Sequence, residues 1–204
     1  MQTKTLTRMG LLLAVLIGLA FAPPITVGFL GVPIVLQNMG VMLVAMLLPT
    51  RPATITIGML LALAALGLPV LTGGRGGIAI FLGPTAGFMY GWLLTPIAYA
   101  AITHYLKPDF WLTKVLGMTF GGVLLTEFLG AAWLAATTSL GFVPALASVL
   151  ISVPGDLLQI ALSLSVVQQL TAVIPALCYI ADPSLTRASN PPLSDNTSRT
   201  PVLS

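Results

Sequence analysis

Charged side chains are nearly absent from this chain, and that scarcity limits its possible folds more than any other feature. Of the 204 residues only 6% are charged, whereas 57% are hydrophobic. In a water-soluble domain about a quarter of all residues are charged. This chain has too few charged residues to cover the surface of a soluble protein of the same size. Lipid must surround most of the folded chain, and the sequence predicts an all-α membrane protein.

Six apolar stretches approach or exceed the roughly 20 residues that a membrane-spanning helix needs. We expect six transmembrane helices in a single domain over residues 1–181. The expected spans are 7–22, 34–48, 53–68, 85–106, 112–138 and 146–174. Residues 182–204 are rich in Ser, Thr, Pro and Asn. Such a segment lacks the apolar surface needed to order itself, so we expect a disordered cytoplasmic tail.

Basic residues divide unequally between the two sides of this six-span arrangement. Seven of the eight fall on one side, and only Arg75 falls on the other. Because cytoplasmic loops collect Lys and Arg, we expect both termini in the cytoplasm and the Gly/Pro-rich stretches 23–33 and 69–84 outside. The alternative is a signal peptide cleaved after Ala22, although Pro23 makes that bond a poor cleavage site.

Two carboxylates, Glu127 and Asp156, lie within apolar spans, where an ionisable residue is costly and marks a candidate functional site. Asp156 follows Pro154-Gly155, so its helix is expected to bend or begin anew there. Gln159 lies three residues on, on the same helix face. The carboxylates can accept hydrogen bonds and the Gln159 amide can both donate and accept them, so together they suit a small ligand with N–H and C=O groups. The alternative is a buried pair that fixes helix packing.

The outer stretch around Arg75 is unusually rich in glycine. Gly73 and Gly74 precede the arginine, and such backbone exposes N–H groups that can hold anions. The Arg75 guanidinium could bind a carboxylate through two parallel hydrogen bonds. The alternative is a flexible linker with a solvated arginine. The chain contains no G-x-x-x-x-G-K-[ST] sequence, so it cannot use ATP through a Walker loop.

Four further residues are expected at the same ligand pocket. Gln37 opens the second span beside the first outer stretch, and Thr85 and Phe88 open the fourth. Trp133 lies near the outer end of the fifth span, where it could stack on a ligand or anchor the membrane interface. We expect no catalytic residue, metal or cofactor.

Small residues recur every four positions along the first span, at Gly10, Ala14, Gly18 and Ala22. Positions four apart share one helix face, and small residues there allow another helix to approach closely in lipid. The partner is either another helix of this chain or a separate subunit.

Several motifs, in order, resemble those of the BioY family, the biotin-specific S components of energy-coupling factor transporters. Residues 67–77 read Gly-Leu-Pro-Val-x-x-Gly-Gly-x-Gly-Gly and residues 83–87 read Gly-Pro-Thr-x-Gly. Pro33-x-x-x-Gln37 and Pro154-Gly155-Asp156 also fit, and the likeness covers residues 7–175. In one respect the chain departs: the family's Asp is followed three residues later by Lys, where Gln159 stands here.

The resemblance implies an S-component fold in a bacterial inner or plasma membrane, with an outer-face pocket for biotin. It also implies that Ala14, Gly18 and Ala22 dock on a membrane coupling subunit driven by separate ATPases. Membrane lipid is a further partner, and nucleic acid is not. Alternatives are an S component for another small vitamin, a proton-coupled secondary transporter that uses Glu127, an intramembrane enzyme, or a scaffold.

Overall fold

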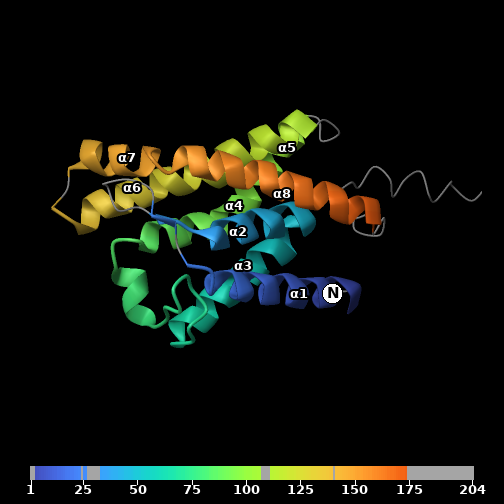
Figure 1. Cartoon of the computed structure of the whole chain (residues 1–204), viewed down its shortest axis with the longest axis horizontal. Helices are drawn as coiled ribbons and strands as arrows, with labels where there is room; N and C mark the ends of the chain where they lie inside the picture. Colours follow the sequence, from blue (N-terminus) through green and yellow to red (C-terminus); the bar gives the residue numbers. More distant parts are fainter. Residues whose placement is uncertain (1–2, 24, 27–32, 107–110, 140, 174–204) are drawn as a thin grey trace, which may run out of the picture.

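Helices make up most of the structure, a computed structural model that describes residues 3–23, 25–26, 33–106, 111–139 and 141–173 (Figure 1). The α-helices are α1 (Thr3–Ala20), α2 (Leu36–Leu47), α3 (Thr50–Ala65), α4 (Ala86–Tyr105), α5 (Trp111–Met118), α6 (Leu125–Thr137), α7 (Phe142–Leu150) and α8 (Val153–Val173). The chain also forms the 3-10 helix η1 (Ile78–Leu82), the π-helix η2 (Thr119–Leu124), and the antiparallel strands β1 (Ile25–Thr26) and β2 (Pro33–Ile34). The tail predicted over 182–204 lies outside the described residues.

The helices form a membrane-embedded bundle. Within the described residues, α1 and the continuous run Trp111–Thr137 are each long and apolar enough to cross a bilayer. The pair α7 and α8 forms a third such span if its 42° bend is counted as one crossing, while α2 and α3 are shorter apolar helices. The number of six crossings therefore stays a prediction.

The sixth predicted span, 146–174, is divided in the structure. α7 ends at Leu150 and α8 begins at Val153, so the break lies just before Pro154. Proline lacks a backbone N–H and is tolerated in the first turn of a helix, which is where Pro154 lies. The new helix start places Asp156 in the first turn of α8.

The fifth predicted span, 112–138, is a single continuous helical run, but it contains the π-helix η2. Gly121 and Gly122 lie inside η2, and a Cβ on Gly121 would come within 2.7 Å of the Tyr99 backbone nitrogen of α4. The missing side chain allows the two helices to approach this closely. A π-helical turn shifts the helix register that follows, and here that register buries Thr126 and Glu127.

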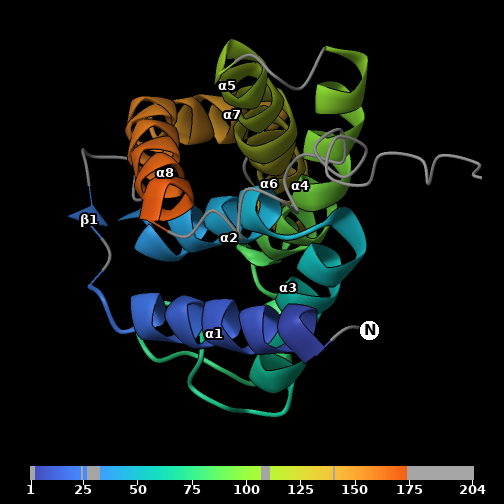
Figure 2. The same cartoon turned by 90° about the vertical axis from the view of Figure 1, so that its right-hand side faces the viewer.

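α2 is the central element of the bundle, and Figure 2 shows it between α1 and α8. One buried apolar cluster joins α2 to α1, α3 and α4 through residues such as Leu16, Val44 and Ile57. A second cluster lies on the other side of α2 and includes Met118 and Ile160. Burial on both sides explains why α2 is apolar around its whole circumference after Gln37 and Asn38 in its first turn.

Residues 69–77, here called the cap loop, fold back over one end of the bundle. Leu71 and Arg75 exchange backbone hydrogen bonds of 3.0 and 3.1 Å, and Gly73 and Gly74 form the turn between them. Both glycines have positive φ, 76° and 68°, which side-chain-bearing residues rarely adopt. The amide of Gly73 donates to the carbonyl oxygen of Ala20 at 3.1 Å, so the cap loop rests on the end of α1.

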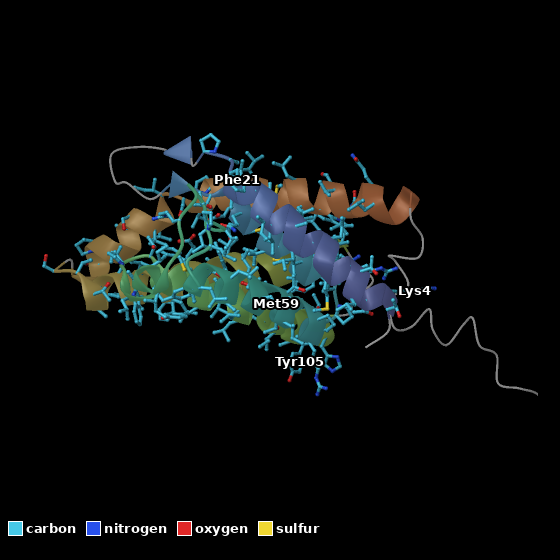
Figure 3. All side chains as sticks on the ribbon, turned by 90° about the horizontal axis from the view of Figure 1, so that it is seen from below. Lys4, Phe21, Met59 and Tyr105 are labelled. Atoms are coloured by element: carbon cyan, nitrogen blue, oxygen red, sulfur yellow. The ribbon has the colours of Figure 1, made fainter. Side chains whose placement is uncertain are left out.

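α1 begins and α8 ends at the same end of the bundle (Figure 1). Figure 3 shows Lys4 and Tyr105 toward that end, with Phe21 at the far end of α1. The cap loop, which carries Arg75, contacts Ala20 at the C-terminal end of α1, whereas Lys4 lies at the N-terminal end. Lys4 and Arg75 therefore lie toward opposite ends of α1.

Candidate functional site

A cavity of about 100 Å³ lies beneath the cap loop, between the adjoining ends of α2, α4, α6 and α8. Its lining combines acids, apolar and aromatic groups, and one cation. The described residues that line it are Val35, Gln37, Asn38, Leu71, Thr72, Arg75, Thr85, Phe88, Met89, Trp92, Thr126, Glu127, Ser152 and Asp156. Six of the predicted pocket residues are among them: Gln37, Arg75, Thr85, Phe88, Glu127 and Asp156.

Asp156 is the most buried acid of the cavity, with 4% of its surface exposed. It lies in the first turn of α8, where the helix dipole favours a negative charge. Its Oδ1 accepts a hydrogen bond of 3.0 Å from Nδ2 of Asn38 on α2. Its Oδ2 is buried and accepts no hydrogen bond from an N–H group of the described residues.

Glu127 of α6 places a second carboxyl group against that of Asp156. It is 8% exposed, and its Oε2 is likewise buried without a hydrogen-bond donor in the described part of the chain. A buried polar atom without a partner costs free energy. The two carboxyl groups therefore form an acceptor site that a ligand with N–H donors would complete.

Aromatic side chains of α4 form the apolar wall. Phe88 and Trp92 lie four residues apart and so share one helix face, with Met89 beside them. The ring of Phe88 packs directly against Gly130 of α6, because a Cβ at position 130 would overlap Phe88 Cε1. Only a glycine at position 130 leaves room for the ring in this position.

Arg75 lies at the open side of the cavity on the cap loop and is exposed to solvent. It is the single cation among the described lining residues. Its Nε donates to the carbonyl oxygen of Thr72 at 3.1 Å, which fixes the base of the guanidinium group. Thr85, at the start of α4, lines the cavity as well and is also exposed.

Four predicted pocket residues do not line the cavity. Gln159 is buried, and its Nε2 donates to the carbonyl oxygen of Val35 at 3.4 Å. The Trp133 indole N–H donates to Gly83 at 2.9 Å, and its ring packs edge-on against Tyr90 at 5.3 Å. Trp133 therefore supports the chain before α4 instead of stacking in the cavity. Gly73 and Gly74 shape the cap loop without lining the cavity.

Several lining residues were not predicted, and Trp92 is the clearest case. An interfacial anchor is the usual interpretation of a tryptophan in such a sequence, yet Trp92 is only 7% exposed and lines the cavity. The spacing of Thr85, Phe88 and Trp92, three and four residues apart, could have indicated that Trp92 shares a helix face with the two predicted pocket residues. Thr72 and Ser152 left no comparable pattern, because each lies outside the regular part of a helix.

The small residues of α1 face outward over most of their length. Gly10, Ala14 and Gly18 are exposed, whereas Ala22, which the sequence placed in this span, lies beyond the end of α1 at Ala20 and is half-buried. A Cβ added to Gly10 or Gly18 would meet no other atom within 4 Å. Within the described structure, packing against this chain's own helices therefore does not explain the stripe.

The cavity as a whole suits a ligand with three chemically distinct parts. Buried acceptors on Asp156 and Glu127 favour N–H donors at the deep end. Phe88 and Trp92 offer apolar surface in the middle, and Arg75 favours an anionic group at the open side. The described lining offers binding groups in the arrangement typical of a small-molecule site.

Comparisons with known proteins agree with this architecture. Biotin transporter BioY of Lactococcus lactis subsp. cremoris (strain MG1363) is 40% identical over 172 residues, which are 83% of this chain and 91% of the relative. Biotin transporter BioY of Rhizobium etli (strain ATCC 51251 / DSM 11541 / JCM 21823 / NBRC 15573 / CFN 42) is 36% identical over 78% of this chain and 88% of its own.

A crystal structure of the S-component for biotin from an ECF-type ABC transporter superposes with a TM-score of 0.79 at 39% identity. The match covers 84% of this chain and 95% of that one, so the fold predicted from the motifs is confirmed. The model of the BioY family matches residues 1–176, which include every element that surrounds the cavity. By its motifs, its fold and this match, the chain belongs to the BioY family.

Proposed function

We propose that this protein captures biotin in the cavity beneath the cap loop, as the substrate-binding subunit of a biotin uptake transporter. The observation that carries the proposal is the pair of buried acceptor atoms, Asp156 Oδ2 and Glu127 Oε2, opposite a cap loop that bears Arg75. The names of its relatives supply the ligand class.

The chemistry of biotin fits the three parts of the cavity. Its ureido ring carries two N–H donors, which match the acceptors of the carboxyl pair. Its sulfur-containing ring and aliphatic chain are apolar and suit Phe88 and Trp92. Its carboxylate suits the guanidinium of Arg75. The chain acts as a binder and permease subunit in this proposal, without chemical conversion of the ligand.

Transport requires a further step, and α1 is the element we assign to it. Ala14, Gly18 and Ala22 are proposed to dock on a membrane coupling subunit that separate ATPases drive. The exposed, sterically open surface at Gly18 supports this assignment. The cavity is proposed to open on the outer face of a bacterial inner or plasma membrane, with both termini in the cytoplasm.

The test is equilibrium binding of several vitamins to the purified protein in detergent. Biotin is expected to bind tightly, whereas thiamine and riboflavin are expected to compete weakly or not at all. Tight binding of another ring compound and none of biotin would instead indicate an S component for a different vitamin.

A second candidate is a secondary transporter coupled to protons. The contact between the Glu127 and Asp156 carboxyl groups favours it, because paired intramembrane acids occur in proton relays. Uptake by this chain alone in proteoliposomes, abolished by a protonophore and by Glu127→Gln, would establish this candidate. Uptake that requires ATPase subunits and survives the protonophore would exclude it.

A further inference from the structure

The side-chain amide of Gln37 is fully buried and uses its entire hydrogen-bonding capacity within the protein. Its Nε2 donates to the carbonyl oxygens of Leu16, at 3.3 Å, and Val70, at 2.8 Å. Its Oε1 accepts from the backbone N–H and from the hydroxyl of Thr72, each at 3.1 Å. A primary amide has two N–H donors and two acceptor lone pairs, so no capacity remains for a ligand.

These four bonds join three segments that are distant in sequence. Leu16 belongs to α1, Gln37 to the first turn of α2, and Val70 and Thr72 to the cap loop. The backbone bond from Gly73 to Ala20 adds a second link between the cap loop and α1. Gln37 thus fixes the cap loop to the two helices beneath it.

Two groups at the cavity depend on this link. Thr72 lines the cavity and receives its position from Gln37 Oε1. Arg75 is held in turn through its Nε bond to the Thr72 carbonyl oxygen. If Gln37 released the loop, the single cation of the described cavity lining would lose its support.

We propose that Gln37 is a positioning residue that holds the cap loop closed over the cavity by tying it to α1 and α2. Breaking the link would leave the Val70 carbonyl oxygen and the buried Thr72 N–H without the Gln37 amide as partner unless the loop moved into water. Loss of the amide should therefore open the loop and speed the release of any ligand beneath it. The part that concerns ligand release rests on the proposed function, but loop closure does not.

Limited trypsin digestion of the ligand-free protein tests loop closure directly. Trypsin cleaves extended backbone after Lys or Arg, and the Leu71–Arg75 hydrogen bonds hold the Arg75 site in a tight turn. The cut separates residues 1–75 from 76–204, so mass identifies it. In Gln37→Met, which has similar volume and no amide, we expect cleavage after Arg75 to be about tenfold faster, as expected for a change of ~1.4 kcal/mol in loop opening.

Gln37→Glu, which keeps the acceptors and loses both donors, should show the same direction of change. The matched control is Asp156→Asn, which should weaken biotin binding and leave cleavage of the ligand-free protein unchanged. Biotin release, measured by dilution of labelled ligand, should be about tenfold faster in Gln37→Met.

Folded Gln37→Met and Gln37→Glu variants with wild-type cleavage would overturn the proposal, even if biotin release were faster, since that result would indicate direct ligand contact. If neither variant is monodisperse, Thr72→Val removes the hydroxyl bond alone. It should give a smaller rise in cleavage, and no rise there would also overturn the proposal. Absence of biotin binding by the wild-type protein would refute the proposed function and leave the cleavage result standing.

Discussion

Asp156 and Glu127 come from different helices, yet their carboxyl groups meet in one cavity. Asn38 supplies the hydrogen bond that holds Asp156 in place. Each carboxyl group retains one buried oxygen without a donor in the described structure. Such a site favours a ligand that brings its own N–H groups.

Gly130 is predicted to control the cavity through Phe88. Gly130→Ala would place a methyl group that overlaps Phe88 Cε1 and would push the ring toward the ligand. We expect biotin affinity to fall about tenfold or more, at an overpacking cost of about 1–3 kcal/mol. Gly58→Ala is the control, since the added methyl would lie at an ordinary 3.8 Å from Leu93. Equal affinity in the two variants would count against the proposed wall.

Arg75 is predicted to recognise the carboxylate of the ligand. Arg75→Gln should weaken binding of biotin severalfold, and the loss should be modest because the side chain is exposed to water. Binding of biotin methyl ester, which lacks the charge, should change little between wild type and variant. Arg51→Gln, an exposed arginine at the start of α3, serves as the control. Equal losses for the acid and the ester would assign Arg75 a different role.

Residue chemistry could be predicted from sequence better than side-chain direction. The two carboxylates were evident because charge is costly in an apolar span, and both line the cavity. Gln159 was placed beside Asp156 because the two share a helix face, but its amide reaches Val35 instead. Trp133 was placed near the outer end, and only the fold shows that its N–H binds Gly83.

At the scale of single helices, α1 differs from the rest in how little of it the bundle covers. Gly10, Ala14 and Gly18 all face outward from the described structure. The opposite face carries Leu16, which is fully buried and whose carbonyl oxygen binds Gln37. One helix therefore presents a proposed docking surface on one face and holds the cap loop through the other.

Gly18→Leu is predicted to separate transport from binding. The new side chain meets no atom of the protein within 4 Å of its Cβ, so the cavity should keep its affinity for biotin. Uptake by cells should fall strongly, because the bulky group would block close helix approach. Ala161→Leu on the exposed face of α8 is the control and should leave uptake intact. Normal uptake with Gly18→Leu would remove α1 from the proposed docking surface.

The positions of proline, glycine and polar residues in the sequence predicted the approximate ends of most helices. They did not predict two local structures, the π-helix and the pair of short strands. The π-helix η2 has no simple sequence signal, since Gly121 and Gly122 alone predict only close packing. The strands β1 and β2 are two residues each and depend on pairing between Ile25 and Ile34 across the chain. Both features arise from tertiary contacts, which local propensity does not determine.

At the scale of the whole molecule, the cavity and the N-terminal basic residue Lys4 lie toward opposite ends of the bundle. The cavity lies beneath the cap loop that carries Arg75, whereas Lys4 and Tyr105, at the end of α4, lie toward the other end of the bundle (Figure 3). In a membrane, this places the proposed binding site away from the side that collects basic residues.

Chemical labelling of single cysteines tests this orientation. In a background with Cys178→Ser, Ile78→Cys should react with a membrane-impermeant maleimide in intact cells, because η1 follows the cap loop. Tyr105→Cys, at the end of α4, should react only after permeabilisation. Both natural side chains are exposed, at 70% and 86%, so access to the reagent is comparable. The reverse pattern would invert the proposed topology.

The most direct test of the account is the affinity for biotin of the wild-type protein and of Asp156→Asn. The substitution keeps the size of the side chain but removes its charge and exchanges one acceptor for a donor. Loss of a hydrogen bond to a charged group corresponds to about 1.5–3 kcal/mol, so the account predicts a roughly ten- to hundredfold weaker Kd in a folded variant. Unchanged affinity in that variant would contradict the assignment of this cavity as the biotin site.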